Sequence, residues 1–284
     1  MKKIGTVFVV LIISLSTFLI ACSKTSIVNE LNHDPDLIIY TTLSRSIYNP
    51  IIKEFQERNE LWIEIHEGSE DDFLDQLHTS DQKLSYDLIF GISQDTLDAS
   101  TDLFTSHSPF ISSPLVIMYN TNVVTYREEP LGFENLTEDH WKNRIGFVDP
   151  EHSLIYEKVL NFAINNSTSP DSFENLFIEN IGNLYAKTAE DINNGVVMGY
   201  YSVGITSEEA AKSLIDAGAE VTYIHPREGE CVVIKATAIL EDCSNYDAAI
   251  KFLDFTCSQD VKQLLKNYLN CNPSDATSIG GESS

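Results

Sequence analysis

Positively charged residues are scarce in this chain. Its 284 residues include 18 lysines and arginines against 43 aspartates and glutamates, which gives a formal net charge of −25 at pH 7. Nucleic acids and anionic lipid headgroups are repelled by such a surface, so we expect neither as a partner. The acidic residues are scattered, and no run is longer than Glu70-Asp71-Asp72. Their simplest effect is solubility.

Catalytic and metal-binding motifs are also missing. The chain has no GxSxG elbow, no Walker loop and no HExxH pair, and its 7 histidines lie far apart. Four cysteines follow one another at spacings of 12, 14 and 14 residues, which match no zinc pattern: Cys231, Cys243, Cys257 and Cys271. They could form disulfides or remain buried thiols. We expect no enzyme and no cofactor.

The longest apolar run lies at the N-terminus. Two lysines precede an uncharged stretch from Ile4 to Ile20, and a small residue and a cysteine follow it. This is the plan of a secretory signal, and about 17 residues fall short of the ~20 that span a bilayer. Leu19-Ile20-Ala21-Cys22 resembles the lipobox of bacterial lipoproteins, which implies cleavage before Cys22 and acylation of its thiol. The mature chain would then carry −25 − 2 = −27, because Lys2 and Lys3 are removed.

Beyond a polar spacer, short apolar strands alternate with amphipathic helices. The pattern predicts strands at 37–40, 62–65, 86–90, 114–120, 144–148 and 221–226, a strand-like segment at 198–205, and helices that include 156–164, 173–181 and 246–269. Strands that alternate with helices indicate an α/β fold with a parallel sheet covered on both faces.

Seven segments together resemble the solute-binding proteins of bacterial ABC importers, in the group that includes ferric-ion, phosphonate and sugar-phosphate binders. They are residues 37–42, 86–91, 113–121, 145–150 with Ser153, 201–206, 224–229, and 248–255 with Ser258. The resemblance implies a two-lobed periplasmic-binding-protein-like fold of type II, with the ligand in the cleft between the lobes. The expected organisation is a signal peptide at 1–21, a tether at 22–36, lobe 1 at 37–114 and 227–270, lobe 2 at 115–226, and a tail at 271–284.

Candidate ligand-binding residues follow the strands, because ligands of open α/β sheets lie beyond the carboxyl ends of strands. Hydroxyls and backbone amides at these positions suit an oxyanion. The candidates are Thr41, Thr42, Ser44, Gly68, Ser69, Ser93, Ser153, Gly204, Thr206 and Glu228. For the serines the alternative is a purely structural role as helix caps.

Ferric members of the resembled group hold iron with adjacent tyrosines. Tyr200-Tyr201 invites that assignment, but the pair reads as the start of a strand, on which only one of two neighbours can face a cleft. Ferric iron therefore remains the alternative ligand rather than the preferred one.

The sequence thus predicts a lipid-anchored, monomeric, extracytoplasmic protein of the cell membrane. It would capture a small anionic solute, of the organophosphate or phosphonate class, and deliver it to an ABC permease with a separate ATPase subunit. A surface lipoprotein or adhesin without a transport role is the second alternative.

Overall fold

The computed structural model describes residues 34–79, 86–269 and 271–274. The chain divides into the segment Met1–Asp36 and a body, Leu37–Ser284. The predicted signal peptide, Cys22, most of the tether and most of the C-terminal tail lie outside the described residues. Within the described part, no helix is both long and apolar enough to cross a membrane.

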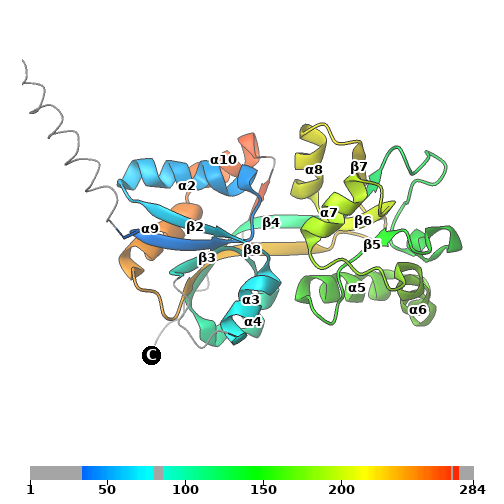
Figure 1. The fold of residues 1–284 in the computed structure, drawn as a ribbon, viewed down its shortest axis with the longest axis horizontal. Coiled ribbons are helices and arrows are strands. Elements are labelled where there is room, and N and C mark those ends of the chain that lie inside the picture. The colour runs from blue at the N-terminus through cyan, green and yellow to red at the C-terminus, as the bar shows by residue number, and fades with distance from the viewer. Residues whose placement is uncertain (1–33, 80–85, 270, 275–284) are drawn as a thin grey trace, which may run out of the picture. The chain divides into compact units, whose positions relative to one another are not determined.

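The first half of the body is built on a mixed sheet, with helices on both faces (Figure 1). Its strands, in sheet order, are β2 (Ile63–Glu67), β1 (Leu37–Thr41), β3 (Leu88–Ser93), β8 (Val232–Leu240) and the first part of β4 (Phe104–Asn120), with β9 (Asn272–Pro273) beside β4. Strand β1 runs parallel to β2 and β3, and β8 runs antiparallel to β3 and β4. One face carries α2 (Arg45–Asn59), α9 (Tyr246–Thr256) and α10 (Gln259–Tyr268), and the other carries α3 (Glu70–Thr79) and α4 (Gln94–Ala99), which the turn η2 (Thr101–Leu103) follows.

The second half has a smaller sheet. It consists of the last part of β4, β6 (Val203–Ser207), β5 (Ile145–Gly146) and β7 (Val221–Ile224). Four helices and two 3-10 turns surround it: α5 (Leu154–Asn166), α6 (Pro170–Ile181), α7 (Ala189–Val197), α8 (Glu208–Asp216), η3 (Glu134–Thr137) and η4 (Asp139–Trp141).

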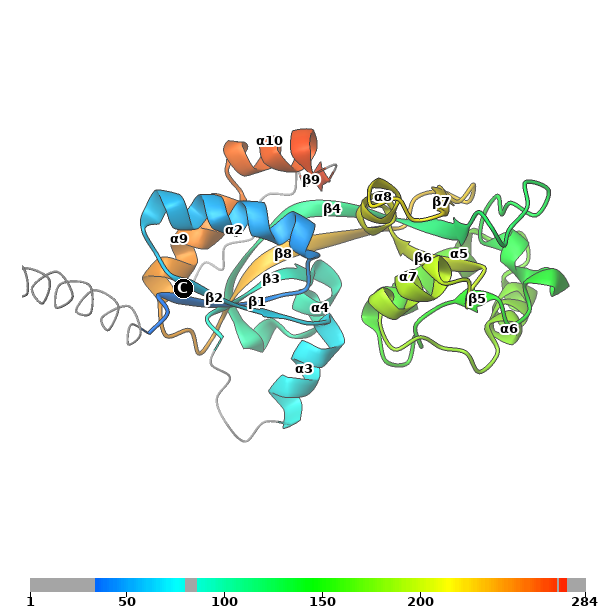
Figure 2. The ribbon, with the colours of Figure 1, turned by 45° about the horizontal axis from the view of Figure 1, so that its top comes forward.

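Two strands connect the halves. Strand β4 pairs with β8 as far as Pro114 opposite Val232, and from Leu115 onward it pairs with β6. Figure 2 shows β4 and β8 running from one half into the other. We call the residues on the β8-paired side lobe one (37–114 and 232–274) and the remainder lobe two (115–231). The return crossing near Cys231 comes slightly after the predicted position at residue 227.

Apolar side chains explain why each lobe is stable. All six residues of β3 are buried, since helices cover both faces of the lobe-one sheet. In that core the ring of Phe90 stacks on Phe110 at 4.9 Å and meets Phe252 edge-on at 5.1 Å. Lobe two has its own core, in which Phe147 and Phe177 are fully buried. The two-lobed α/β fold predicted from the sequence is therefore confirmed.

Four predictions or omissions of the sequence analysis differ from the structure. Strand β4 begins at Phe104 rather than near Pro114, and β8 and α7 were not predicted. The long helix predicted for 246–269 is two helices, because α9 ends at Thr256 and Ser258 caps α10 by accepting the Val261 N–H at 3.3 Å.

Candidate solute-binding site

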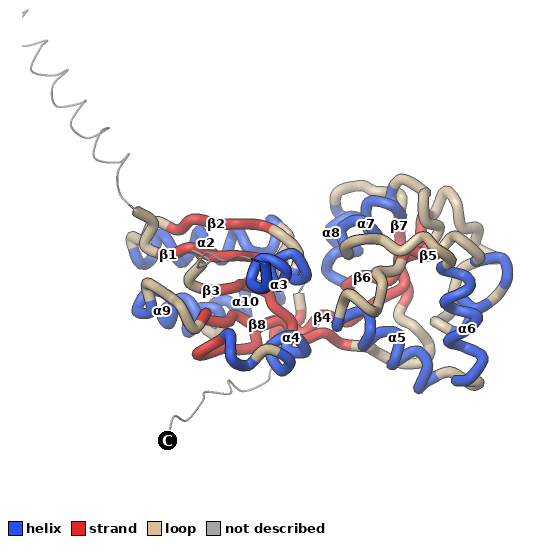
Figure 3. The backbone as a smooth tube through the Cα atoms, turned by 60° about the horizontal axis from the view of Figure 1, so that its bottom comes forward, coloured by secondary structure: helices blue, strands red, loops and turns tan. Residues whose placement is uncertain are grey.

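A cavity of about 220 Å³ lies where the two lobes meet. Figure 3 places α3 and α4 at the edge of lobe one that faces α5. Lobe one contributes Glu70, Asp71 and Leu74 from α3 and Thr96 from α4, and lobe two contributes Pro150 to Ile155 and Glu157, from the loop before α5 and its first turn. The volume is below the ~300 Å³ at which drug-sized pockets begin, so the cavity suits a small molecule.

The lobe-two wall is the N-terminus of a 13-residue helix. Ser153 is its N-cap residue and is only 7% exposed, yet its side chain makes no cap hydrogen bond. Intrahelical bonding begins further along, since Glu157 N–H donates to the Ser153 carbonyl. The amides of Leu154, Ile155 and Tyr156 have no acceptor among the described residues. Such donors, together with the helix dipole, attract negative charge.

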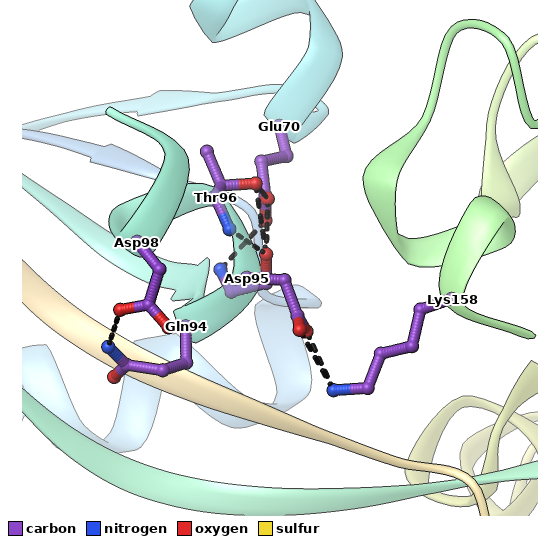
Figure 4. A network of polar contacts seen from close by, with 7 residues as sticks. Glu70, Gln94, Asp95, Thr96, Asp98 and Lys158 are labelled. Atoms are coloured by element: carbon purple, nitrogen blue, oxygen red, sulfur yellow. Dashed lines mark hydrogen bonds and ion pairs between the residues drawn. The ribbon is translucent and has the colours of Figure 1, made fainter. Parts of the chain in front are cut away.

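The lobe-one wall is anchored through Glu70. Its carboxylate accepts hydrogen bonds from Ser93 N at 2.9 Å, from Ser93 Oγ at 2.6 Å and from Thr96 Oγ1 (Figure 4). Ser93 also caps α4, because its hydroxyl accepts the Thr96 N–H. This network fixes the start of α3 against α4, and it leaves the charge of Glu70 well solvated by protein donors.

Asp71 is in a different electrostatic position. Its carboxyl is partly buried, and no hydrogen bond or ion pair joins it to the part of the chain that the structure describes. Burial first, and then repulsion by Glu70, Asp72 and Asp75, raise the pKa of Asp71 to about 6, while His152 across the cavity acts in the opposite sense. Asp71 therefore lies among like charges, and none of the described residues forms a hydrogen bond or an ion pair with it.

An ion pair joins the lobes beside the cavity. Lys158 Nζ of α5 donates to both carboxylate oxygens of Asp95 in α4, at 2.8 and 3.0 Å (Figure 4). The two side chains remain 37% and 33% exposed. The pair neutralises a cation next to the site and links the lobes.

The three residues predicted to bind ligand in the loop after β1 form hydrogen bonds within the protein instead. The hydroxyls of Thr41 and Thr42 donate to the carbonyls of Phe90 and Gly91, at 2.9 and 2.6 Å. Ser44 precedes α2 without a cap hydrogen bond, and its hydroxyl pairs with that of a neighbouring serine at 3.0 Å. None of the three lines the cavity.

Other predicted site residues have structural roles. Gly68 packs under the Tyr40 ring, Ser69 caps α3 by accepting the Asp72 N–H at 3.0 Å, and a Cβ on Gly204 would lie 2.4 Å from Ile192 of α7. Thr206 is buried, and its hydroxyl has no partner among the described residues, but it does not line the cavity.

The Glu228 side chain forms hydrogen bonds with the backbone at the start of η3. Its carboxylate accepts the N–H groups of Phe133 at 3.1 Å and Glu134 at 2.9 Å, and its side chain is 4% exposed. The carboxylate therefore ties this loop to the segment after β7. Of the ten candidates, Ser153 alone lines the cavity, and Ser93 supports it from behind.

The side chains of Tyr200 and Tyr201 do not point to a common site. Tyr200 is 76% exposed, whereas the Tyr201 ring packs against Gly146 and Gly195 and its hydroxyl donates to the Leu184 carbonyl at 3.2 Å. Among the described residues, no group of three histidine, cysteine, aspartate or glutamate side chains is arranged to hold a metal ion. Cys231, Cys257 and Cys271 are free thiols.

Sequence reasoning missed Asp71, Asp95 and Lys158. Asp71 lies in the run Glu70-Asp71-Asp72, directly after the second predicted strand. We interpreted that run as solvent-exposed acidic residues that favour solubility. Acidic residues are common in the first turn of a helix, so the run alone does not identify a site.

Comparisons with known proteins agree with this architecture. Residues 38–268 match the family described as bacterial extracellular solute-binding protein. The periplasmic binding protein AfuA from Actinobacillus pleuropneumoniae, solved with fructose-6-phosphate, has a TM-score of 0.71 at 16% identity, over 84% of this chain and 84% of that chain. A ferric binding protein from Campylobacter jejuni has a TM-score of 0.66 at 17% identity, over 85% and 88%. A protein described as a two-component system protein in signal transduction has a TM-score of 0.67 at 20% identity, over 83% and 85%.

At these identities the structural likeness establishes the fold, which is that of the two-lobed periplasmic binding proteins. The family match covers most of the chain, so this protein belongs to the bacterial extracellular solute-binding proteins. The family gives the chain an extracellular role in which it binds a solute. No curated protein matches the sequence.

Proposed function

We propose that this protein is the lipid-anchored component that captures a small solute between its lobes and delivers it to the permease of an ABC importer, which a separate ATPase powers. The observation that carries the proposal is the cavity lined by α3 and α4 of lobe one and by α5 of lobe two. A solute held there contacts both lobes, so it favours the closed arrangement through its differential affinity for that state.

The connection between the lobes suits this motion. The backbone crosses in two neighbouring strands, at Pro114 to Leu115 in β4 and near Cys231 before β8. Each lobe keeps its own apolar core on its side of the crossing. Small changes in the dihedral angles of a few strand residues can then move one lobe as a rigid body.

An oxyanion remains the ligand group that the lobe-two wall supports. Ser153 and the first amides of α5 provide donors, and they require no deprotonated ligand. The other predicted donors, Thr41 and Thr42, are already bonded to carbonyls. The ferric alternative has weaker support, because Tyr200 and Tyr201 lie outside the cavity lining.

The anchor is proposed on Leu19-Ile20-Ala21-Cys22. Only the Cys22 thiol can accept the lipid, so Cys22→Ala should move the protein from the detergent phase to the aqueous phase in Triton phase partitioning. A variant that stays wholly in the detergent phase would contradict the lipoprotein assignment.

Native mass spectrometry of the gently purified protein tests the capture of a solute. We expect a small polar molecule at one copy per chain, lost on dialysis. A reproducibly empty protein whose solution scattering is unchanged by any extracted solute would instead favour the adhesin.

A further inference from the structure

The two walls of the cavity present different groups without described partners, and each wall belongs to a different lobe. Lobe one presents Asp71, a carboxylate without a described partner, and lobe two presents the first turn of α5 with Ser153. We propose that the solute is a small zwitterion, with its ammonium group against Asp71 and its carboxylate or phosphoryl group at the N-terminus of α5. This inference rests on the solute-binding role proposed above and narrows its substrate class.

The Ser153 side chain supports a ligand at this wall independently of the helix dipole and of the acidic residues. The residue is 7% exposed and lines the cavity, and none of the described residues forms a hydrogen bond with its hydroxyl. Its oxygen remains accessible from the cavity, so a solute held there can form a hydrogen bond with it. The amides of Leu154, Ile155 and Tyr156 add donors at the same end.

The lobe-one wall needs a cation. Glu70 already has three hydrogen-bond donors, but Asp71 has none among the described residues and stands beside Glu70, Asp72 and Asp75. An ammonium group offers three donors and a positive charge, which relieve both deficits. Lys158 cannot serve, because Asp95 holds it.

Simpler solutes fit less well. A dianion would meet Glu151 and Glu157, which flank the first turn of α5, on a chain of net charge −25. A simple organic cation would leave Ser153 and the helix amides unpaired. A metal ion lacks its ligands, since the described residues hold no suitable group of three side chains. An ammonium group on the same molecule offsets the anionic charge, fully for a carboxylate and in part for a phosphoryl group, and such a solute satisfies both walls.

Matched pairs of probes test this inference. Titration calorimetry on the dialysed protein would compare phosphoethanolamine with ethyl phosphate, and β-alanine with propionate. Each pair shares its anion and differs in the amine, and the two pairs separate a phosphoryl from a carboxylate source. We expect at least one amine-bearing probe to bind about tenfold or more tightly than its amine-free partner, as for a charge-assisted hydrogen bond.

Variants assign the two ends. Asp71→Asn should abolish the preference for the amine, whereas Ser153→Ala should weaken both members of a pair about equally. Asp254→Asn removes the same charge from an exposed face of α9 outside the cavity, and Ser172→Ala removes an exposed hydroxyl from α6, so both should bind as the unmodified chain does.

Two results would overturn the zwitterion. One is equal binding of the amine-bearing and amine-free probes. The other is failure of both amine-bearing probes to bind at millimolar concentration. If the solute that co-purifies still compacts the protein in solution scattering, the solute-binding function stands without the zwitterion. If it does not, both proposals fail.

Discussion

At the scale of single residues, Asp71 links the site to stability. Its pKa is about 6 in the folded chain against 3.8 for the free group. The group therefore contributes stability that is fully present below pH 4 and is lost as the pH rises through 6. Without solute, Asp71→Asn should raise the free energy of unfolding by about 1 kcal/mol at pH 7, after allowance for solvent screening.

Urea unfolding at pH 4 and pH 7 measures this effect. At pH 4 the variant and the unmodified protein should have nearly equal stability, because the carboxyl is protonated in the folded state. The charged and titratable groups around it are Glu70, Asp72 and Asp75 on α3 and Glu151, His152 and Glu157 on the opposite wall of the cavity. A variant destabilised at pH 7 would show that Asp71 has a favourable partner.

Glu228 should affect stability and leave solute affinity unchanged. Its buried carboxylate accepts two backbone N–H groups, so Glu228→Ala should lower the free energy of unfolding by about 1–3 kcal/mol. Glu228→Gln keeps one acceptor oxygen and should lose less. Chemical unfolding gives the stability, and calorimetry with the co-purified solute gives the affinity. Weaker binding by a variant of normal stability would restore the role in ligand binding predicted from the sequence.

At the scale of elements, the apolar pattern of the sequence predicts the helices and strands whose apolar residues follow a regular spacing. Strand β1 and helices α5 and α6 were predicted from their apolar residues. Strand β8 was not predicted, because Lys235 interrupts its apolar run. The structure accommodates Lys235 through an ion pair with Glu209, which is distant in sequence, at 3.7 Å. Helix α7 was hidden by Gly195, whose lack of a side chain admits the Tyr201 ring.

The candidate site follows the same logic. Ser153 was predicted as a ligand contact, because it follows a predicted strand and lies in a segment that resembles the ligand loop of the family. Asp71 was not, because an acidic residue in the first turn of a helix is ordinary until another lobe faces it. That approach depends on how β4 and β8 join the lobes, which no local pattern encodes.

The pairing of α4 with α5 predicts a kinetic effect. The ion pair between Lys158 and Asp95 is about one-third exposed, so it should contribute only about 0.5 kcal/mol to the closed state. Lys158→Met should therefore speed solute dissociation about twofold, and Asp95→Asn should do the same. In stopped-flow measurements the double variant should match either single variant, because both changes remove one interaction. Additive effects would show that the two residues act separately.

At the scale of the whole molecule, the two proposed contact groups, Asp71 and the N-terminus of α5, belong to different lobes. Asp71 alone gives a cationic group one contact surface, and α5 alone gives an anionic group another. A solute that carries only one of the groups binds one lobe and has little differential affinity for the closed state. A solute that carries both bridges the cavity, so binding and closure are coupled through the solute itself.

Solution scattering should therefore distinguish binding from closure. The co-purified solute should reduce the radius of gyration of the unmodified protein, since the lobes swing about β4 and β8 as they close. The double variant Asp71→Asn with Ser153→Ala should not compact at the same solute concentration, because neither wall can hold its end. The variant Asp254→Asn is the control and should compact normally. Identical scattering curves with and without saturating solute in the unmodified protein would contradict coupling between binding and closure, whatever the affinity.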